Sequence, residues 1–165
     1  MKDFASRALN VAQLEGARYA DIRIINSRQQ TASVKDGHVD GIGDQDSQGF
    51  GVRVLVGDSW GFASSAFISA VEIDRVTSLA VKIARASAMV PGEPVDLGPP
   101  VTGVGQYATP FQIDPFSIPL EQKLDPLFRV DERIRRNRGV KVAESNVIAV
   151  RHQKVFANTE NAFLE

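Results

Sequence analysis

The chain has 165 residues, of which 43% are hydrophobic and 24% charged, and its net charge is −1. These values are typical of a globular domain and exclude a disordered, fibrous or broadly basic nucleic-acid-binding chain. The absence of cysteine excludes disulfides, thiolate zinc sites and cysteine nucleophiles within these residues. The start, MKDFASRALNVAQLEG, lacks the apolar core of a signal peptide, and no later run is as long as a membrane span. We therefore expect a cytoplasmic protein.

The first predicted element is a helix over residues 4–15. Phe4, Ala8 and Val11 recur at helical spacing, and Gly16 follows where a helix end favours a left-handed residue. A short amphipathic helix is therefore expected at this end of the chain.

Two β-hairpins are predicted next. In the first, residues 21–25 alternate in polarity, and Asp36-Gly37 suits a type I′ turn that would pair Lys35 with His38. The same register would place Val34 opposite Val39.

The second hairpin is SQGFGVRVLVGDSWGFASS, residues 47–65, with Gly57-Asp58 as its turn. Small residues at 59, 61 and 63 would leave room for a helix on one face, and the other face would carry larger side chains. The predicted pairs are Val56 with Ser59, Leu55 with Trp60, Val54 with Gly61 and Arg53 with Phe62.

A second helix is predicted over residues 69–89, because Ser69 and Glu72 have the spacing of a capping box and an apolar stripe follows. The order helix, strands, helix predicts an α+β fold, in which two helices cover an antiparallel sheet of hairpins. We assign this domain to residues 1–90.

The remaining chain is predicted as a linker, residues 91–118, and the start of a second, incomplete α+β unit, residues 119–165. All eight prolines lie between positions 91 and 126, which is typical of a boundary. Pro119 suits the first position of a third helix, in which Pro126 would cause a kink or break. Two strands around a turn at His152-Gln153 would follow.

Three patterns that could indicate ligand binding have simpler structural interpretations. The only histidines, His38 and His152, are expected to be exposed turn residues, because a metal site needs three or four ligands. Residues 44–49, DQDSQG, resemble half of a calcium loop, but the twelfth position is Leu55 instead of glutamate, which favours a polar loop between strands. The glycines of GFGVRVLVG, Gly49 and Gly51 among them, match no phosphate-binding pattern and favour a bulge or bend.

Arg53, Trp60 and Phe62 are the candidate interface or peptide-contact residues. Arg53 beside the two aromatic rings predicts a cation–π pair on the sheet surface, or alternatively a contact for a bound peptide. We predict no catalytic, cofactor-binding or metal-binding residue in this chain.

The cationic run RIRRNRGVK, residues 133–141, could form a nucleic-acid patch. Acidic residues lie on the same predicted helix, and cations suit the carboxyl end of a helix dipole. We therefore favour a solvated helix end and do not expect a nucleic-acid partner.

Four segments resemble the amino-terminal part of the TldD/PmbA family of metalloproteases, once described as modulators of DNA gyrase. They are GARYADIRI at 16–24, VKDGHVDGI at 34–42, the hairpin at 47–65, and KVFANTENAFLE at 154–165. The hairpin is closer to the TldD branch. The family usually has glycine after an Asn-Ser/Thr-polar sequence near the end of this region, where this chain has Asn161.

The resemblance implies that zinc is held by an HExxxH helix in a carboxy-terminal domain, a motif absent from these 165 residues. It implies homo- or heterodimers of TldD/PmbA-type chains and unfolded or modified peptides as substrates. The chain would then be an inactive amino-terminal portion that supplies scaffold, dimer interface and chamber walls. The alternatives are a standalone interaction module that pairs with a full-length family member, and a nucleic-acid-binding domain.

Overall fold

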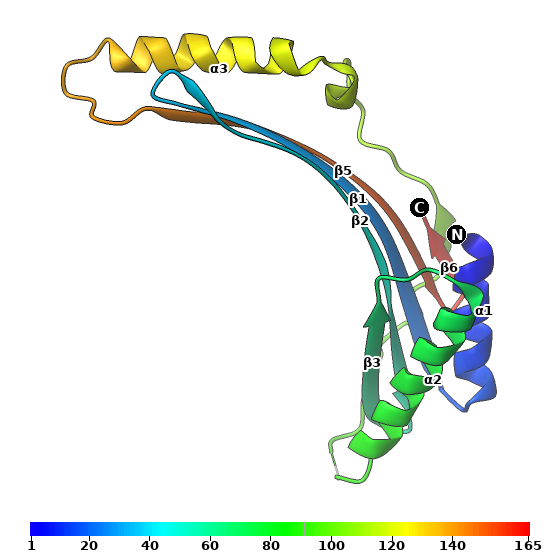
Figure 1. The fold of residues 1–165 in the computed structure, drawn as a ribbon. Helices are drawn as coiled ribbons and strands as arrows, with labels where there is room; N and C mark the ends of the chain where they lie inside the picture. The colour runs from blue at the N-terminus through cyan, green and yellow to red at the C-terminus, as the bar shows by residue number, and fades with distance from the viewer. Residues whose placement is uncertain (91) are drawn as a thin grey trace. The chain divides into compact units, whose positions relative to one another are not determined.

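The computed structural model describes residues 1–90 and 92–165 and contains a six-stranded sheet in the order β3-β2-β1-β5-β6-β4 (Figure 1). The chain separates into two compact units. The first unit comprises Met1–Asn26, Ser47–Ala108 and Gln153–Glu165, and the second comprises Ser27–Asp46 and Thr109–His152. Three long strands, β1 (Tyr19–Lys35), β2 (His38–Val56) and β5 (Glu144–Asn158), contribute residues to both units. This architecture confirms the predicted α+β class.

The two units are made of interleaved segments, whereas the predicted ranges 1–90, 91–118 and 119–165 follow one another along the chain. Residues 27–46 belong with the segment that contains the third helix, and residues 153–165 belong with the first unit. Whether residues 1–90 and 119–165 fold as separate domains joined by a linker at 91–118 stays a prediction.

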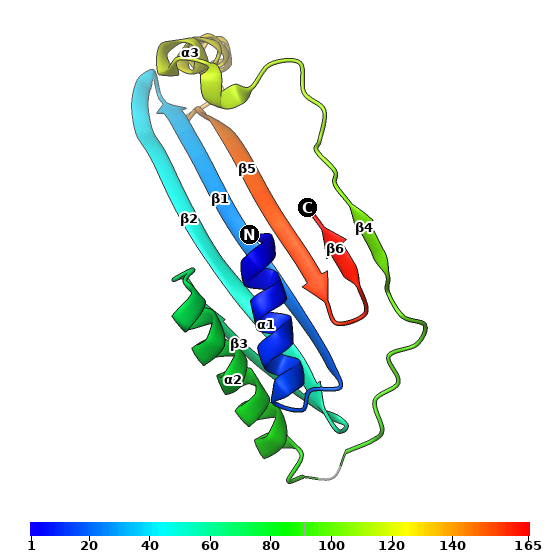
Figure 2. The same cartoon turned by 90° about the vertical axis from the view of Figure 1, so that its right-hand side faces the viewer.

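In the first unit, helices α1 (Lys2–Leu14) and α2 (Ala70–Ser87) lie over one face of the sheet (Figure 2). The predicted pair of covering helices is therefore confirmed. Their apolar sides and the sheet form one core, whose fully buried members include Ala5, Ala8, Ala12, Ile22, Ile24, Val52, Val54, Ile73, Val76 and Val81. Among the described residues, no helix has the length and apolar character needed to cross a bilayer.

Local sequence signals set the carboxyl end of α1 and the amino end of α2, as predicted. Gly16 follows α1 with a φ of +87°, the left-handed conformation that glycine adopts without steric cost. Ser69 precedes α2, and its hydroxyl accepts a hydrogen bond from the backbone N–H of Glu72 at 3.2 Å.

The hairpin of β2 and β3 (Ser59–Ser65) has the predicted register, including Arg53 opposite Phe62 and Leu55 opposite Trp60. Gly61 also has the predicted role of admitting a helix. A Cβ atom at this position would lie 2.0 Å from the carbonyl oxygen of Ala80 on α2, a distance at which atoms overlap. Helix α2 therefore packs against bare backbone.

The edge of the first unit is formed by β4 (Gly103–Gly105), which pairs in parallel with β6 (Ala162–Leu164). A turn stabilised by Asn158 precedes β6: its side-chain oxygen accepts from the N–H of Glu160 at 3.0 Å and of Ala162 at 2.8 Å. Asn161 in this turn has a φ of +70°. Asparagine thus takes the left-handed conformation at the position where the family usually has glycine.

The second unit packs α3 (Leu120–Arg135) on the sheet, after a short 3₁₀ helix, η1 (Pro115–Ser117). Leu127 of α3 joins Ala32 and Val34 of β1 in a small core, flanked by Val147 of β5. The turn between β1 and β2 consists of Asp36 and Gly37, both with positive φ, as a type I′ turn requires.

The predicted register beyond this turn is wrong by one residue. A Cβ atom at Gly41 would lie 3.2 Å from Ser33 Oγ, whereas the predicted register puts Asp40 opposite Ser33.

Helix α3 continues through Pro126, so the predicted break is absent. Pro126 is exposed, and water can therefore bind the carbonyl oxygen that loses its N–H partner. The helix begins at Leu120, one residue later than expected, and Pro119 precedes it.

Two predicted loops are also strand. Strand β5 runs uninterrupted through His152 and Gln153, and residues 44–49 lie within β2. Neither His152 nor Gln153 has the positive φ of a tight turn. Asp44 is held on its strand by Arg28 of β1, because the two side chains form an ion pair at 2.8 Å.

Candidate functional site

The three predicted contact residues lie together on one side of the β2–β3 hairpin. The guanidinium carbon of Arg53 is 4.7 Å from the centroid of the Trp60 ring, so the expected cation–π pair is present. Phe62 lies directly opposite Arg53 on the neighbouring strand. With Tyr19 and Asp21 of β1 these residues form a surface that we call the aromatic face.

Trp60 is only partly exposed on this surface. The cause is Tyr19, whose ring meets Trp60 edge-on at a centroid distance of 5.9 Å and an interplanar angle of 83°. Phe62 is 57% exposed and is therefore the ring of this surface that is open to a partner.

Asp21 anchors the aromatic face and was missed by the sequence analysis. Its carboxylate is 1% exposed and accepts a hydrogen bond from Arg53 Nε at 2.8 Å, with an Arg53 terminal nitrogen at 2.6 Å. Arg23 approaches the other oxygen only to 3.9 Å. A buried carboxylate is stable only with such partners, so Asp21 fixes the position of the Arg53 guanidinium.

The charges of the aromatic face are fixed at neutral pH. Burial raises the pKa of Tyr19, and the negative charge of Asp21 raises it further. Burial acts to lower the pKa of Arg53, but the hydrogen bond and charge of Asp21 outweigh it and the pKa is raised. Tyr19 is therefore a neutral phenol and Arg53 a cation, an arrangement suited to binding and not to proton transfer.

Gly51 supports the exposed ring. A Cβ atom at this position would lie 2.8 Å from Phe62 Cε2, so the absence of a side chain lets the Phe62 ring lie over the strand. Gly51 pairs with Ser64 in a regular ladder, and the predicted bulge is therefore absent at this residue.

Metal ligands do not gather among the residues that the structure describes: no three histidine, aspartate or glutamate side chains are placed to hold an ion. His38 is exposed beside the β1–β2 turn, where its Nδ1 lies 3.1 Å from the carbonyl oxygen of Asp36. His152 is exposed in the middle of β5. The zinc ligands that the resemblance implies would lie in a carboxy-terminal domain, and the described residues provide no substitute for them.

The acidic residues 44–49, which resemble half of a calcium loop in sequence, include an aspartate that pairs with a neighbouring strand. Arg28 donates to both oxygens of Asp44, at 3.1 and 2.8 Å, and Gln30 donates to one of them at 2.7 Å. These hydrogen bonds lower the pKa of Asp44 to about 2, and the bond from Arg28 has the largest effect. Leu55, at the twelfth position, is fully buried. Asp44 therefore belongs to a surface ion pair.

The cationic run 133–141 is partly neutralised by its own helix. Arg135 pairs with Asp131 at 2.6 Å and Arg136 with Glu132 at 2.9 Å, both one turn apart. This pairing agrees with a solvated helix end.

Comparison with known proteins identifies the type of domain. The sequence family described as PmbA/TldA metallopeptidase domain 1 matches residues 20–88. A metalloprotease of Methanocaldococcus jannaschii is 29% identical over 157 residues, which cover 92% of this chain and 34% of that protein. The chain thus spans about a third of the length of this curated relative.

Solved structures share the fold. TldE from Thermococcus kodakarensis matches with a TM-score of 0.72 and 11% identity, over 97% of this chain and 36% of that one. A protein described as a modulator of DNA gyrase from Bacteroides thetaiotaomicron matches with a TM-score of 0.80 and 13% identity, over 98% of this chain and 37% of that one. The matches in sequence and fold support the resemblance of the hairpin and its flanking segments to the amino-terminal part of the TldD/PmbA family: residues 20–88 match the first domain of PmbA/TldA metallopeptidases, and nearly the whole chain has the fold of the two solved structures.

Proposed function

We propose that this chain is a non-catalytic part of a TldD/PmbA-type zinc metallopeptidase that processes unfolded or modified peptides. In this proposal it supplies scaffold, dimer interface and a wall of the peptide chamber. The relatives support the peptidase class, because one is named a metalloprotease and residues 20–88 match a metallopeptidase domain. Zinc and the catalytic residues would come from an HExxxH segment outside residues 1–165.

The observation that carries the proposal is the exposed ring of Phe62, which lies over Gly51 beside the ion pair of Arg53 and Asp21. Arg53, its partner on the neighbouring strand, is held by the buried carboxylate of Asp21 and by Trp60. An aromatic ring that is ordered before binding loses little conformational entropy when it meets a partner. Such a ring suits either a second family chain or an apolar side chain of an extended peptide.

Replacing Phe62 tests this role. We expect Phe62→Ser to weaken association with a TldE-type partner chain, or self-association, at least tenfold in analytical ultracentrifugation. Phe67→Ser is the matched control, because Phe67 lies in the same unit and is 76% exposed but outside the aromatic face. Unchanged association and unchanged peptide affinity in the Phe62 variant would remove the proposed role.

Reading the gene beyond codon 165 separates this proposal from its main alternative. An in-frame HExxxH segment is expected if the chain is part of a peptidase. Its absence would favour a standalone interaction module that pairs with a full-length family member.

The cytoplasmic location and the lack of a nucleic-acid partner stay predictions. The average composition and lack of cysteine favour the cytoplasm. Binding to DNA would require salt-dependent retention on a DNA column, which we do not expect, because Arg135 and Arg136 are paired with acidic residues of α3.

A further inference from the structure

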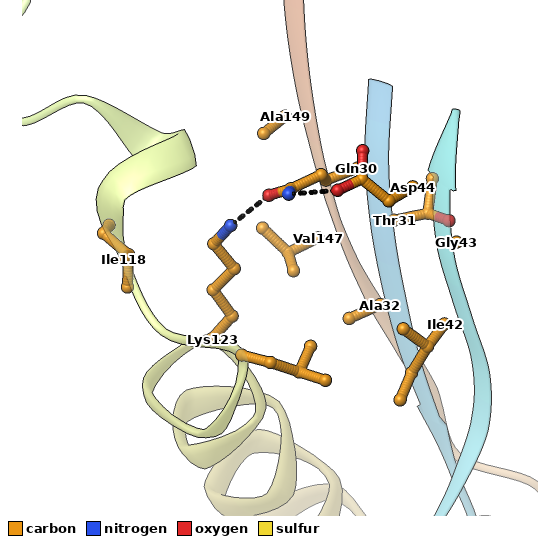
Figure 3. Close-up of a pocket in the computed structure, with 11 residues that line it drawn as sticks. Gln30, Thr31, Ala32, Ile42, Gly43, Asp44, Ile118, Lys123, Val147 and Ala149 are labelled. Atoms are coloured by element: carbon orange, nitrogen blue, oxygen red, sulfur yellow. Dashed lines mark hydrogen bonds between the residues drawn. The ribbon is translucent and has the colours of Figure 1, made fainter. Parts of the chain in front are cut away.

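A groove in the second unit lies between α3 and the strands β1, β2 and β5 (Figure 3). Its volume is about 210 Å³, and it shares no residue with the aromatic face. Most of its wall is apolar and is formed by Ala32, Ile42, Ile118, Leu120, Val147 and Ala149.

One end of the groove carries a row of hydrogen-bonded polar side chains. Lys123 Nζ donates to Gln30 Oε1 at 2.5 Å, and Gln30 Nε2 donates to Asp44 Oδ2 at 2.7 Å (Figure 3). Arg28 completes the row with two hydrogen bonds to Asp44. The donors of Arg28 and Gln30 thus converge on the one carboxylate.

Lys123 is the member of this row with unused hydrogen-bonding capacity. Its ammonium group has three N–H donors. Among residues 1–90 and 92–165, the ammonium group has one hydrogen-bond partner, Gln30, and no carboxylate oxygen lies within 4.0 Å of it. Two other cations of the second unit are paired: Arg28 with Asp44 and, at 4.0 Å, with Asp46, and Arg151 with Asp114. A partly buried cation beside an apolar groove complements a ligand in which a carboxylate adjoins an apolar group.

We propose that the groove binds the carboxy-terminal residue of a peptide that ends in an aliphatic amino acid. The terminal carboxylate pairs with Lys123, and the aliphatic side chain lies against Ile42, Val147 and Ala149. The volume supports a single residue, because it is below the roughly 300–1,000 Å³ of pockets that hold drug-sized molecules or cofactors. The proposal rests on the proposed peptide-handling function for the source of the ligand.

The test uses the 165-residue chain and N-acetyl-Gly-Gly-Leu with a free carboxylate, followed by ¹H–¹⁵N NMR. We expect saturable shift changes at Ala32, Gly43 and Ala149. The corresponding carboxy-terminal amide and N-acetyl-Gly-Gly-Gly should each bind at least tenfold more weakly, because one lacks the charge and the other the side chain.

Two variants locate the binding energy. Lys123→Gln should abolish the preference for the acid over the amide, whereas Lys141→Gln, an exposed lysine of the same unit outside the groove, should keep it. Ala149→Leu fills the groove and should eliminate binding of both peptides while the circular dichroism spectrum stays unchanged.

Equal affinity for acid and amide, shifts confined to other residues, or a Lys123→Gln variant that keeps the preference would overturn the proposal. The result is independent of the aromatic face, because Phe62→Ser leaves the groove intact. A failure here is therefore distinguishable from a failure of the proposed interface.

Discussion

Arg53 and Asp21 form an ion pair in which the carboxylate is buried and the Arg53 side chain is 41% exposed, with 2.6 Å between nitrogen and oxygen. The two residues contribute unequally to stability. Loss of the exposed cation leaves a buried anion without its main partner, and that is the costly change.

We therefore expect Arg53→Met to lower the free energy of unfolding by about 1–3 kcal/mol, the usual cost of leaving a buried charged group unsatisfied. Urea denaturation measures this change. Arg23→Met is the control, because Arg23 approaches the same carboxylate only to 3.9 Å, and its effect should stay within about 0.5 kcal/mol. Equal losses in the two variants would contradict the assignment of Arg53 as the main partner.

Gly61→Ala should destabilise the first unit by about 1–3 kcal/mol or more, because the new methyl group overlaps the backbone of α2 and forces the helix to move. Gly105→Ala serves as the reference, since its Cβ would make an ordinary contact at 3.6 Å. The midpoint of thermal unfolding compares the two variants. A neutral Gly61→Ala variant would mean that α2 does not pack this closely on β3.

Asn161 offers a test of backbone strain. Asn161→Ala should cost about 1–2 kcal/mol because alanine pays the penalty of the left-handed conformation, whereas Asn161→Gly should be neutral or slightly stabilising. Chemical denaturation of the three proteins gives the order. If alanine is tolerated as well as glycine, the turn before β6 does not hold this conformation in solution.

Asp44 gives a pH-dependent prediction. Its pKa of about 2 lies below the ordinary value of 3.8, so its hydrogen bonds contribute to stability in full above pH 3.8 and lose their contribution as the pH falls through 2. A ¹³C NMR titration of the side chain should show a midpoint near 2, which moves toward 3.8 in an Arg28→Gln variant. A midpoint that is the same in both proteins would exclude Arg28 as the cause.

The sequence predicted the parts of the fold that depend on local signals. The turn Gly57-Asp58 fixed the register of β2 and β3, and thereby placed Arg53, Trp60 and Phe62 on one face. The Ser69 cap and the glycine after α1 likewise act over a few residues, and both were identified correctly.

The ion pair of Asp21 and Arg53 could not be found in the same way, because it depends on register across two long strands. The turn at Asp36-Gly37 predicts that Asp21 lies opposite Val52, which would put Asp21 and Arg53 on different faces. The observed shift of one residue moves Asp21 opposite Arg53 and reverses that outcome. The pairing of the two strands far from their turn, which the turn motif alone does not reveal, thus decided the chemistry of the aromatic face.

The turn expected at His152-Gln153 shows a second limit. Polar residues in a row suggested an exposed loop, but a strand with exposed side chains has the same composition. Likewise, the acidic residues of β2 remain on a strand because Arg28 and Gln30 stand beside Asp44. Such partners come from another strand, so a short stretch of sequence around Asp44 does not reveal them.

The interleaving of the two units restricts how proteins of this type can be recombined. An exchange of the second unit between relatives needs four junctions, after residues 26, 46, 108 and 152, and three of these cut through the continuous strands β1, β2 and β5. A chimaera with a single crossover would join strands of different ancestry within one sheet. Hybrid proteins with one breakpoint are therefore expected to fold only when the parents agree in strand length and pairing.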